Sequence, residues 1–479
     1  MAIQLLSRYY DLKKSQGELD FVDVPVRRDI RLFVDPFALS LIPGDWAYRA
    51  HTTLVSYFDR LVSAIRRGRR DVAIGLLQNL HEPNETRLGL SRGRPQGAGI
   101  GKYQALELYD VFSQSAAVES GLISSISESE LFIDGIGHDK ISDLTTNIIR
   151  IHLIDYTREQ SALHNIPTRR VALKPYYSAE EASWKSEYFD VPVAGGVPVL
   201  MVPKAIVRLS PYYDHRQFYN NYYLEFLQSE HLDANTSLVH TFKNQRRAVF
   251  KKTLRPRFPM TKEELFNFAR THPDVLEEYK SDLAGLQREG AEYELSAHEE
   301  TVISKALIEA LAGIPTGSST ASDYHNLMIG IMEFLFYPFL LCPKKEQEIN
   351  QRRKRIDIVM DNCASSGVFH RIPNAARIQA YFIVIECKNY SSDPANPELD
   401  QLIGRFSTNR GKVGILCCRR FENKELFVER CRDTLRDGHG LIIPLDDVTI
   451  VQCLEKISNN EREDVNLIVD NIVEEIFAT

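Results

Sequence analysis

The sequence predicts a mixed α/β protein whose C-terminal part is built around a central mixed sheet. Three observations predict this. Short apolar runs rich in β-branched residues, typical of buried strands, occur at 381–385, 413–418 and 441–443. A helical pattern near 425–436 separates the last two runs, and a linker rich in Gly, Ser and Thr at 313–320 precedes all three. This alternation favours a sheet with helices packed against it.

The length of 479 residues suggests two to three domains. We expect an N-terminal α+β domain for recognition or sensing at 1–195. A mostly helical region rich in basic and aromatic residues follows at 196–312, as part of the same domain or as a separate one. The sheet domain and its terminal helices are expected at 316–479. The N-terminal region is therefore the larger part of the chain, and the sheet domain makes up about a third of it.

Three local patterns predict structure in the N-terminal half. Alternation of apolar and polar residues over 19–36 suggests a hairpin. Apolar residues at helical spacing over 54–65 predict a helix. A second helix is expected over 144–156, with Ser142 or Asp143 as its N-cap.

The bulk composition limits the class of protein. A net charge of −7 argues against a protein that coats nucleic acid over its whole surface, but 344–436 holds 18 Lys and Arg against 12 Asp and Glu. The seven cysteines show no C-x-x-C spacing, as expected for reduced thiols of a cytosolic protein, so a zinc site is not predicted. We find no signal peptide and no apolar run long enough to span a membrane. The expected location is the cytoplasm.

Two charged residues follow the apolar run at 381–385. Glu386 and Lys388 are two apart, so on a strand they point the same way, while Cys387 points to the other face. Burying these charges is costly unless they are paired or hold a metal. Asp357 lies 29 positions earlier in another apolar run, a spacing that allows a neighbouring strand. Two carboxylates from adjacent strands suit Mg²⁺, and a lysine beside them can orient or deprotonate an attacking water. The set indicates a metal-dependent phosphodiesterase.

These residues carry a resemblance to a known family. The pattern Asp357…Glu386-Cys387-Lys388 resembles the PD-(D/E)XK signature of the restriction-endonuclease-like nuclease superfamily. Ile356 stands where the signature often has proline, a departure that the family tolerates. The resemblance covers roughly residues 316 to 450 and leaves the first 300 residues unexplained.

Two further segments resemble the same superfamily. Gln401 and Arg405 resemble the glutamine-containing helix that follows the E-x-K strand, and their i, i+4 spacing would place them on one helix face. Glu333 is the only ionisable residue in the run 328–336, and it resembles the acidic residue on the first helix that supplements the metal site in some members. The three segments occur in the order that the superfamily requires.

The resemblance implies a restriction-endonuclease-like α/β/α domain and an endonuclease that uses Mg²⁺, with Mn²⁺ as a substitute. The implied metal ligands are Asp357, Glu386, the main-chain carbonyl of Cys387, and Glu333. Lys388 would position or activate the water. Gln401 and Arg405 would hold the phosphate or the lysine.

Each candidate also has an ordinary structural interpretation. Asp357 can pair with Arg355 or Lys354 at the surface, and Glu386 with Lys388 can form a plain salt bridge at a strand end. An exposed helix face explains Gln401 and Arg405 nearly as well as a catalytic role does.

A second candidate surface lies outside the sheet domain. The segment 243–257 contains seven basic residues and no acid. It is either a nucleic-acid-binding patch or a solvated basic face. The residues proposed to contact nucleic acid are Lys243, Arg246, Arg247, Lys251 and Lys252, together with Arg405 at the nuclease site.

The predicted function is a DNA endonuclease acting in restriction or anti-phage defence, a biological role that rests on fold analogy alone. One alternative is an interaction protein whose nuclease-like domain only binds nucleic acid. Another is a nuclease of the same fold that cuts RNA. Paired-strand cutting would suggest a homodimer, and any ATP hydrolysis would belong to a separate partner such as an ATPase or helicase, because no phosphate-binding loop motif is present.

Overall fold

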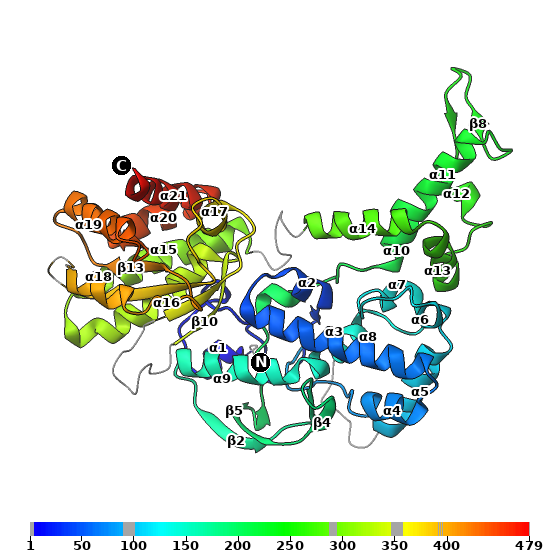
Figure 1. The fold of residues 1–479 in the computed structure, drawn as a ribbon, viewed down its shortest axis with the longest axis horizontal. Helices are drawn as coiled ribbons and strands as arrows, with labels where there is room; N and C mark the ends of the chain where they lie inside the picture. The colour runs from blue at the N-terminus through cyan, green and yellow to red at the C-terminus, as the bar shows by residue number, and fades with distance from the viewer. Residues whose placement is uncertain are drawn as a thin grey trace.

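The computed structural model of the chain describes residues 4–89, 101–286, 295–345, 358–390, 392, 394 and 396–478. The described residues form a mixed α/β protein with two large hydrophobic cores. One core is built mainly from residues between Leu6 and Leu283, and the other mainly from residues between Ile303 and Ile476. Figure 1 shows the two bodies side by side, with a narrow arm projecting beyond the first.

The C-terminal core is organised by a five-stranded mixed sheet with the order β10-β11-β12-β13-β14. Its strands are β10 Leu340–Lys344, β11 Ile358–Asn362, β12 Phe382–Lys388, β13 Val413–Cys418 and β14 Leu441–Asp446. The pairs β10/β11 and β11/β12 are antiparallel, whereas β12/β13 and β13/β14 are parallel. The strands predicted from the three apolar runs are confirmed as β12, β13 and β14. Because β13 and β14 are buried along their whole length, they read as continuous apolar runs.

Seven helices accompany this sheet in the part of the chain that the structure describes. They are α15 Ala297–Gly313, α16 Ala321–Phe336, α17 Gly367–Asn374, α18 Asn396–Ile403, α19 Lys424–Arg436, α20 Asp447–Ser458 and α21 Glu463–Phe477. The helix predicted near 425–436 is confirmed as α19. The helix α15 packs against α20, so the C-terminal core begins before the linker at 313–320 rather than after it.

The helices α16 and α18 cover opposite faces of the sheet. Leu402 of α18 packs against Gly414 of β13, and Gly414 pairs with Val384 of β12. Tyr324 of α16 instead interacts with Cys387 and Cys417. Each of these lies three positions further along its strand than Val384 or Gly414, so the two cysteines point to the opposite face of the sheet. Since side chains alternate along a strand, the Glu386 side of β12 faces α18 and the Cys387 side faces α16.

The N-terminal core is mostly helical with short strands. Its helices are α1 Leu6–Tyr9, α2 Pro36–Leu41, α3 Asp45–Arg66, α4 Arg70–Leu77, α5 Gly101–Ser113, α6 Ala116–Ser120, α7 Ser129–Phe132, α8 His138–Ile148 and α9 Arg150–Leu163. Its strands are β1 Phe33–Val34, β2 Thr168–Ala172, β3 Tyr176–Ser178, β4 Ser183–Lys185, β5 Tyr188–Ala194, β6 Val197–Pro198 and β7 Val207–Arg208. The helix predicted over 54–65 is confirmed within α3, which buries Leu54, Phe58 and Leu61.

The region after β7 forms a helical extension, and a hairpin in the middle of this region forms its tip. It contains α10 His215–Phe218, a π-helical turn η3 Tyr219–Tyr223, α11 Leu224–Asp233, β8 His240–Thr241, β9 Arg247–Ala248, α12 Lys251–Leu254, α13 Lys262–Thr271 and α14 Pro273–Leu286. The hairpin β8/β9 lies at the tip of the projecting arm in Figure 1. None of the described helices is both long and apolar enough to cross a membrane.

Two N-terminal expectations are wrong. The segment 19–36 is not a hairpin, because its only strand, β1, pairs with the distant β7, and Phe21 forms a bridge with Pro203. The alternating pattern correctly indicates extended backbone, but it does not specify the partner. The helix expected over 144–156 is instead two helices, α8 and α9, and α8 starts at His138. Ser142 is inside α8, where its hydroxyl accepts a hydrogen bond from the Val34 amide at 2.9 Å instead of capping the helix.

The two cores meet along α16. The short 3-10 helix η1, Gln16–Glu18, packs against this helix. Gly330 permits the close approach, because a Cβ at this position would lie 2.6 Å from Nζ of Lys14. On the other side of the junction, α9 packs against β10, and Gln160 donates a hydrogen bond to the Pro343 carbonyl at 2.8 Å.

Candidate active site

The predicted E-x-K residues lie at the end of β12. The apolar run from Phe382 places this strand in the middle of the sheet, with β11 on one side and β13 on the other. Glu386 and Lys388 share one face, and they are only 1% and 8% exposed. Two charged groups are therefore held in an apolar layer, where each needs a partner.

Glu386 and Lys388 are partners of each other, and the segment around α18 supplies two further partners. Nζ of Lys388 lies 2.7 Å from Oε1 of Glu386 and donates a hydrogen bond to Oε1 of Gln401 at 2.9 Å. The Arg405 guanidinium donates to Oε2 of Glu386 and is only 2% exposed. One buried carboxylate thus meets two cations, and an amide fixes one of them.

The structure brings together four of the predicted site residues: Glu386, Lys388, Gln401 and Arg405. The position of Arg405 differs from the prediction. Gln401 is in the last turn of α18, but Arg405 follows the end of that helix. The turn is closed by backbone hydrogen bonds from Gly404 to Asp400 and from Arg405 to Leu402. Arg405 was expected to hold phosphate or the lysine, and its contact in the structure is instead with the Glu386 carboxylate.

Two residues beyond Lys388 complete the surroundings of the site and were not predicted. The side-chain amide of Asn389 donates to the carbonyls of Pro315 and Gly317 and to the Thr320 hydroxyl, at 2.9–3.1 Å. It therefore ties the end of the E-x-K strand to the linker at 313–320. The Lys388 ammonium lies 5.8 Å from the centre of the Tyr390 ring. Their only sequence signal is that they directly follow Lys388.

The second predicted carboxylate, Asp357, lies outside the described residues. The described part of β11 begins at the next residue, Ile358, which pairs with Ile385 of β12. Ile385 directly precedes Glu386 in the chain. Within the described ranges no cluster of three or more His, Cys, Asp or Glu side chains has the spacing of a metal site. The predicted role of the Cys387 carbonyl stays a prediction.

Glu333 lies in a different ionic cluster. It is on α16, nine residues or about two and a half turns after Tyr324, so it faces away from the sheet toward the N-terminal core. Its Oε2 is 4.0 Å from Nζ of Lys204, and neither carboxylate oxygen has a hydrogen-bond partner among the described residues. Burial raises the pKa of Glu333 well above its ordinary value, with Asp20 adding to the shift and Lys204 opposing it. The apolar run around Glu333 signalled burial, but it did not indicate which partner the acid would meet.

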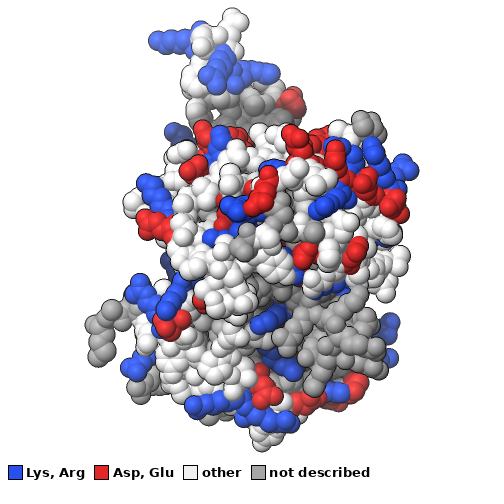
Figure 2. Space-filling view, turned by 90° about the vertical axis from the view of Figure 1, so that its left-hand side faces the viewer, with Lys and Arg blue, Asp and Glu red and all other residues white. Residues whose placement is uncertain are grey.

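The predicted basic patch lies on the projecting arm. Lys243, Arg246 and Arg247 are exposed on or next to the β8/β9 hairpin, and Lys and Arg side chains gather on the projecting part at the top of Figure 2. Lys252 is also exposed, but Lys251 is half-buried and pairs with Glu225 at 2.8 Å. The exposed rings of Phe242 and Phe250 lie 6.2 Å apart beside these cations. Basic residues with neighbouring aromatics are the composition that unpaired nucleic acid recognises.

Comparison with known proteins bears on the N-terminal core only. A family model described as a domain of unknown function, DUF8370, matches residues 11–214. No curated protein and no solved structure matches the chain significantly. The matched segment ends before the projecting arm and does not include β12 or α18.

Proposed function

We propose that this chain is a metal-dependent nuclease that hydrolyses phosphodiester bonds in DNA. The observation that carries the proposal is the convergence of Glu386, Lys388, Gln401 and Arg405 on one buried face of β12. A structural salt bridge needs one cation for one carboxylate. Here Glu386 meets two cations, Lys388 and Arg405, and Gln401 holds the lysine in a fixed orientation. This arrangement suits a site that binds and attacks a phosphate.

The sheet supports the same proposal. A restriction-endonuclease-like fold requires a mixed sheet with helices on both faces, and β10–β14 with α16 and α18 meet that requirement. Ile358 and Ile385 are ladder partners, and Asp357 and Glu386 are their immediate neighbours in sequence. Asp357 is therefore the proposed source of the second carboxylate.

The donor set fits Mg²⁺ if Asp357 takes part. Glu386 supplies one hard oxygen ligand in a water-poor position, Asp357 would supply a second, and the Cys387 carbonyl a third. Arg405 and Lys388 both contact Glu386, so a metal ion would compete with these cations for its oxygens. When bound, the ion would polarise the phosphate and lower the pKa of a water molecule.

The protein's own residues then have separate tasks. Lys388 donates hydrogen bonds, and in the proposal it orients the attacking water. Gln401 accepts from the Lys388 ammonium and limits the positions that it can adopt. Arg405 supplies a buried positive charge that stabilises the charge developing on the phosphate. The exposed cations of the arm, Lys243, Arg246 and Arg247, would hold DNA at a distance from the cut.

The test compares the wild-type chain with Glu386→Gln and Lys388→Met. Each protein is incubated with linear, circular and single-stranded DNA and with RNA, in Mg²⁺, Mn²⁺ or EDTA. We expect the wild type to cleave DNA in either metal and not in EDTA, and both variants to lose cleavage while remaining folded by circular dichroism. Lys456→Met is the matched control, because it removes a half-buried lysine paired with Glu461 and Asp464 far along the chain from β12.

Other outcomes would redirect or reject the proposal. Cleavage of RNA alone would keep the site and change the substrate. DNA binding without cleavage in any metal would favour an interaction protein, and a function in defence would then need another effector. Cleavage that persists in both variants would place the catalytic centre elsewhere.

A further inference from the structure

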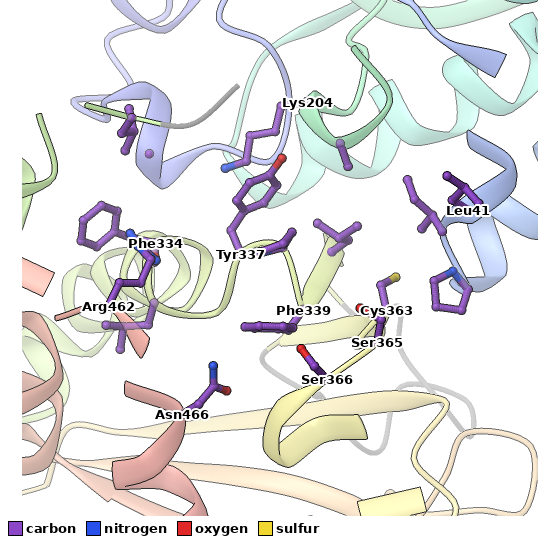
Figure 3. Close-up of a pocket in the computed structure, with 18 of the residues that line it drawn as sticks. Leu41, Lys204, Phe334, Tyr337, Phe339, Cys363, Ser365, Ser366, Arg462 and Asn466 are labelled. Carbon is purple, nitrogen blue, oxygen red and sulfur yellow. The ribbon is translucent and has the colours of Figure 1, made fainter. Parts of the chain in front are cut away.

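A cavity lies where the two cores meet. Its volume is about 550 Å³, within the range of small-molecule sites. Ile42, Lys204 and Arg208 line it from the N-terminal core, and Phe339, Ser366 and Asn466 from the C-terminal core. Figure 3 shows Lys204 on one side of this space, and Ser366 and Asn466 on the other. None of the four converging residues at β12 lines the cavity.

The cavity contains two buried cations with incomplete partners. Lys204 and Arg208 are 3% and 1% exposed. The Lys204 ammonium donates one hydrogen bond, to the Leu19 carbonyl at 2.6 Å, and lies 4.1 Å from the centre of the Tyr337 ring. Arg208 donates from NH1 to the carbonyls of Ala205 and Val207, but its Nε has no hydrogen-bond partner among the described residues. Cations buried with spare donors favour an anion.

The nearby acids do not satisfy this charge. Glu333 is the closest carboxylate to Lys204, but its Oε2 lies 4.0 Å from Nζ of Lys204, and neither of its oxygens has a hydrogen-bond partner among the described residues. Asp20 accepts a hydrogen bond from the Tyr156 hydroxyl at 2.6 Å, and burial raises its pKa. Asp35, which interacts with Arg208, accepts hydrogen bonds from the Phe37 and Tyr212 amides at 2.8 Å, and burial raises its pKa as well. Burial lowers the pKa of Lys204, so an anion placed beside it would favour its charged form.

The rest of the lining suits an aromatic group. The rings of Phe334, Tyr337 and Phe339 line the cavity between its two sides. Arg462 is held by Glu300 at 2.6 Å and by the Phe334 carbonyl at 2.9 Å, so it forms a fixed part of the wall. A phosphate near Lys204 and Arg208 and a planar base along these rings would use both parts of the lining.

We propose that this cavity binds a nucleotide, a phosphate ester with an aromatic base, that acts as a ligand separate from the DNA substrate. The bound molecule would contact both cores at once and fix their relative position. One wall is α16, whose other side packs against β12. If the proposed nuclease function is correct, the nucleotide therefore regulates cleavage at Glu386.

The first test is binding to the full-length chain, measured by thermal unfolding and isothermal titration calorimetry. The probes are AMP, ADP, ATP, GTP and cyclic AMP, with adenosine and pyrophosphate as the two halves of such a ligand. We expect at least one nucleotide to raise the unfolding midpoint and to bind at one site per chain, and each half to bind at least tenfold more weakly. Lys204→Met and Arg208→Met should lose this binding.

Two further variants keep the test decisive if those proteins fold poorly. Ser365→Trp fills the cavity from an exposed position without changing a cation, and it should abolish binding. Lys262→Met is the matched control, because Lys262 is another buried lysine, bonded to the Ile133 and Ile136 carbonyls, that does not line the cavity. It should bind as the wild type does.

The proposal is overturned if no nucleotide binds, or if Ser365→Trp binds as the wild type does. Binding of pyrophosphate as tightly as any nucleotide would also overturn it, because the rings would then contribute nothing. The nuclease proposal is judged separately, by cleavage. A chain that binds a nucleotide but never cuts nucleic acid would retain the cavity assignment and reject the nuclease.

Discussion

Two buried glutamates, one on β12 and one on α16, show how differently the same residue can be used. Glu386, on β12, has cations at both carboxylate oxygens. Glu333, on α16, has a lysine 4.0 Å away and no hydrogen bond to either oxygen within the described residues. Both are at most 1% exposed. Burial is therefore common to the two, and the number of partners distinguishes them.

The difference indicates two electrostatic states. A carboxylate that meets Lys388 and Arg405 is favoured as the charged form, because separating it from them would leave two buried cations unpaired. The pKa of Glu333 is raised by burial, which favours its neutral form. Of the two, Glu386 is the one that we retain as a ligand in the proposed metal site.

The largest expected effect is on catalysis. Glu386→Gln should lower the rate of DNA cleavage by about 10²–10⁴-fold, because it removes a charged ligand at the proposed reaction centre. Glu333→Gln should leave the rate within about threefold, since an amide replaces an acid of the same shape whose raised pKa favours the neutral form. Initial rates on plasmid DNA in Mg²⁺ would measure both. Equal losses in the two variants would show that Glu333 belongs to the active site after all.

The next effect is on stability. Glu386→Gln should lower the free energy of unfolding by about 3–5 kcal/mol, because Arg405 and Lys388 remain buried without a counter-charge. The same change at Glu333 should cost less than about 1 kcal/mol, because burial raises the pKa of this acid and so favours the neutral form, which the amide resembles. Urea denaturation of each variant beside the wild type provides the measurement. A greater loss for the Glu333 variant would reverse the comparison.

The pH dependence gives a smaller and more specific signature. The pKa of Glu333 is raised in the folded chain above the value of about 4.3 expected when unfolded. At pH values above the unfolded pKa, the folded state therefore binds more protons than the unfolded state. The stabilising contribution of Glu333 is fully present below the unfolded pKa and is lost as the pH rises through the folded pKa.

Wild type and Glu333→Gln should therefore differ with pH. The wild type should lose stability relative to the variant as the pH increases from about 4.3. Denaturation curves for the two proteins at matched pH values would give the difference directly. A constant difference across the range would mean that Glu333 is charged throughout.

The smallest effect is expected at the edge of the Glu386 cluster. Gln401 is exposed, and it makes one hydrogen bond to Lys388. Gln401→Ala should lower cleavage by about fivefold, corresponding to one hydrogen bond of roughly 1 kcal/mol, and should hardly change stability. Comparison of kcat with KM would separate orientation of the lysine from substrate binding. A loss as large as that of Lys388→Met would make Gln401 as important as the lysine itself.

Much of the C-terminal half follows from local sequence. The apolar runs predict β12, β13 and β14 because buried strands need continuous apolar residues, and the two-residue spacing of Glu386 and Lys388 places them on one face. The i, i+4 spacing of Gln401 and Arg405 predicted proximity to the site. It did not predict that Arg405 lies beyond the end of α18 and binds the carboxylate.

The sequence by itself determined which residues are buried and which side of a strand they occupy, since these depend on periodicity and on the cost of exposing apolar groups. Only the tertiary structure decided the partners. It paired β1 with β7, directed Ser142 to the Val34 amide, and turned Glu333 toward Lys204. Such choices join segments more than a hundred residues apart, and no local pattern encodes which of several distant polar groups a buried side chain will meet.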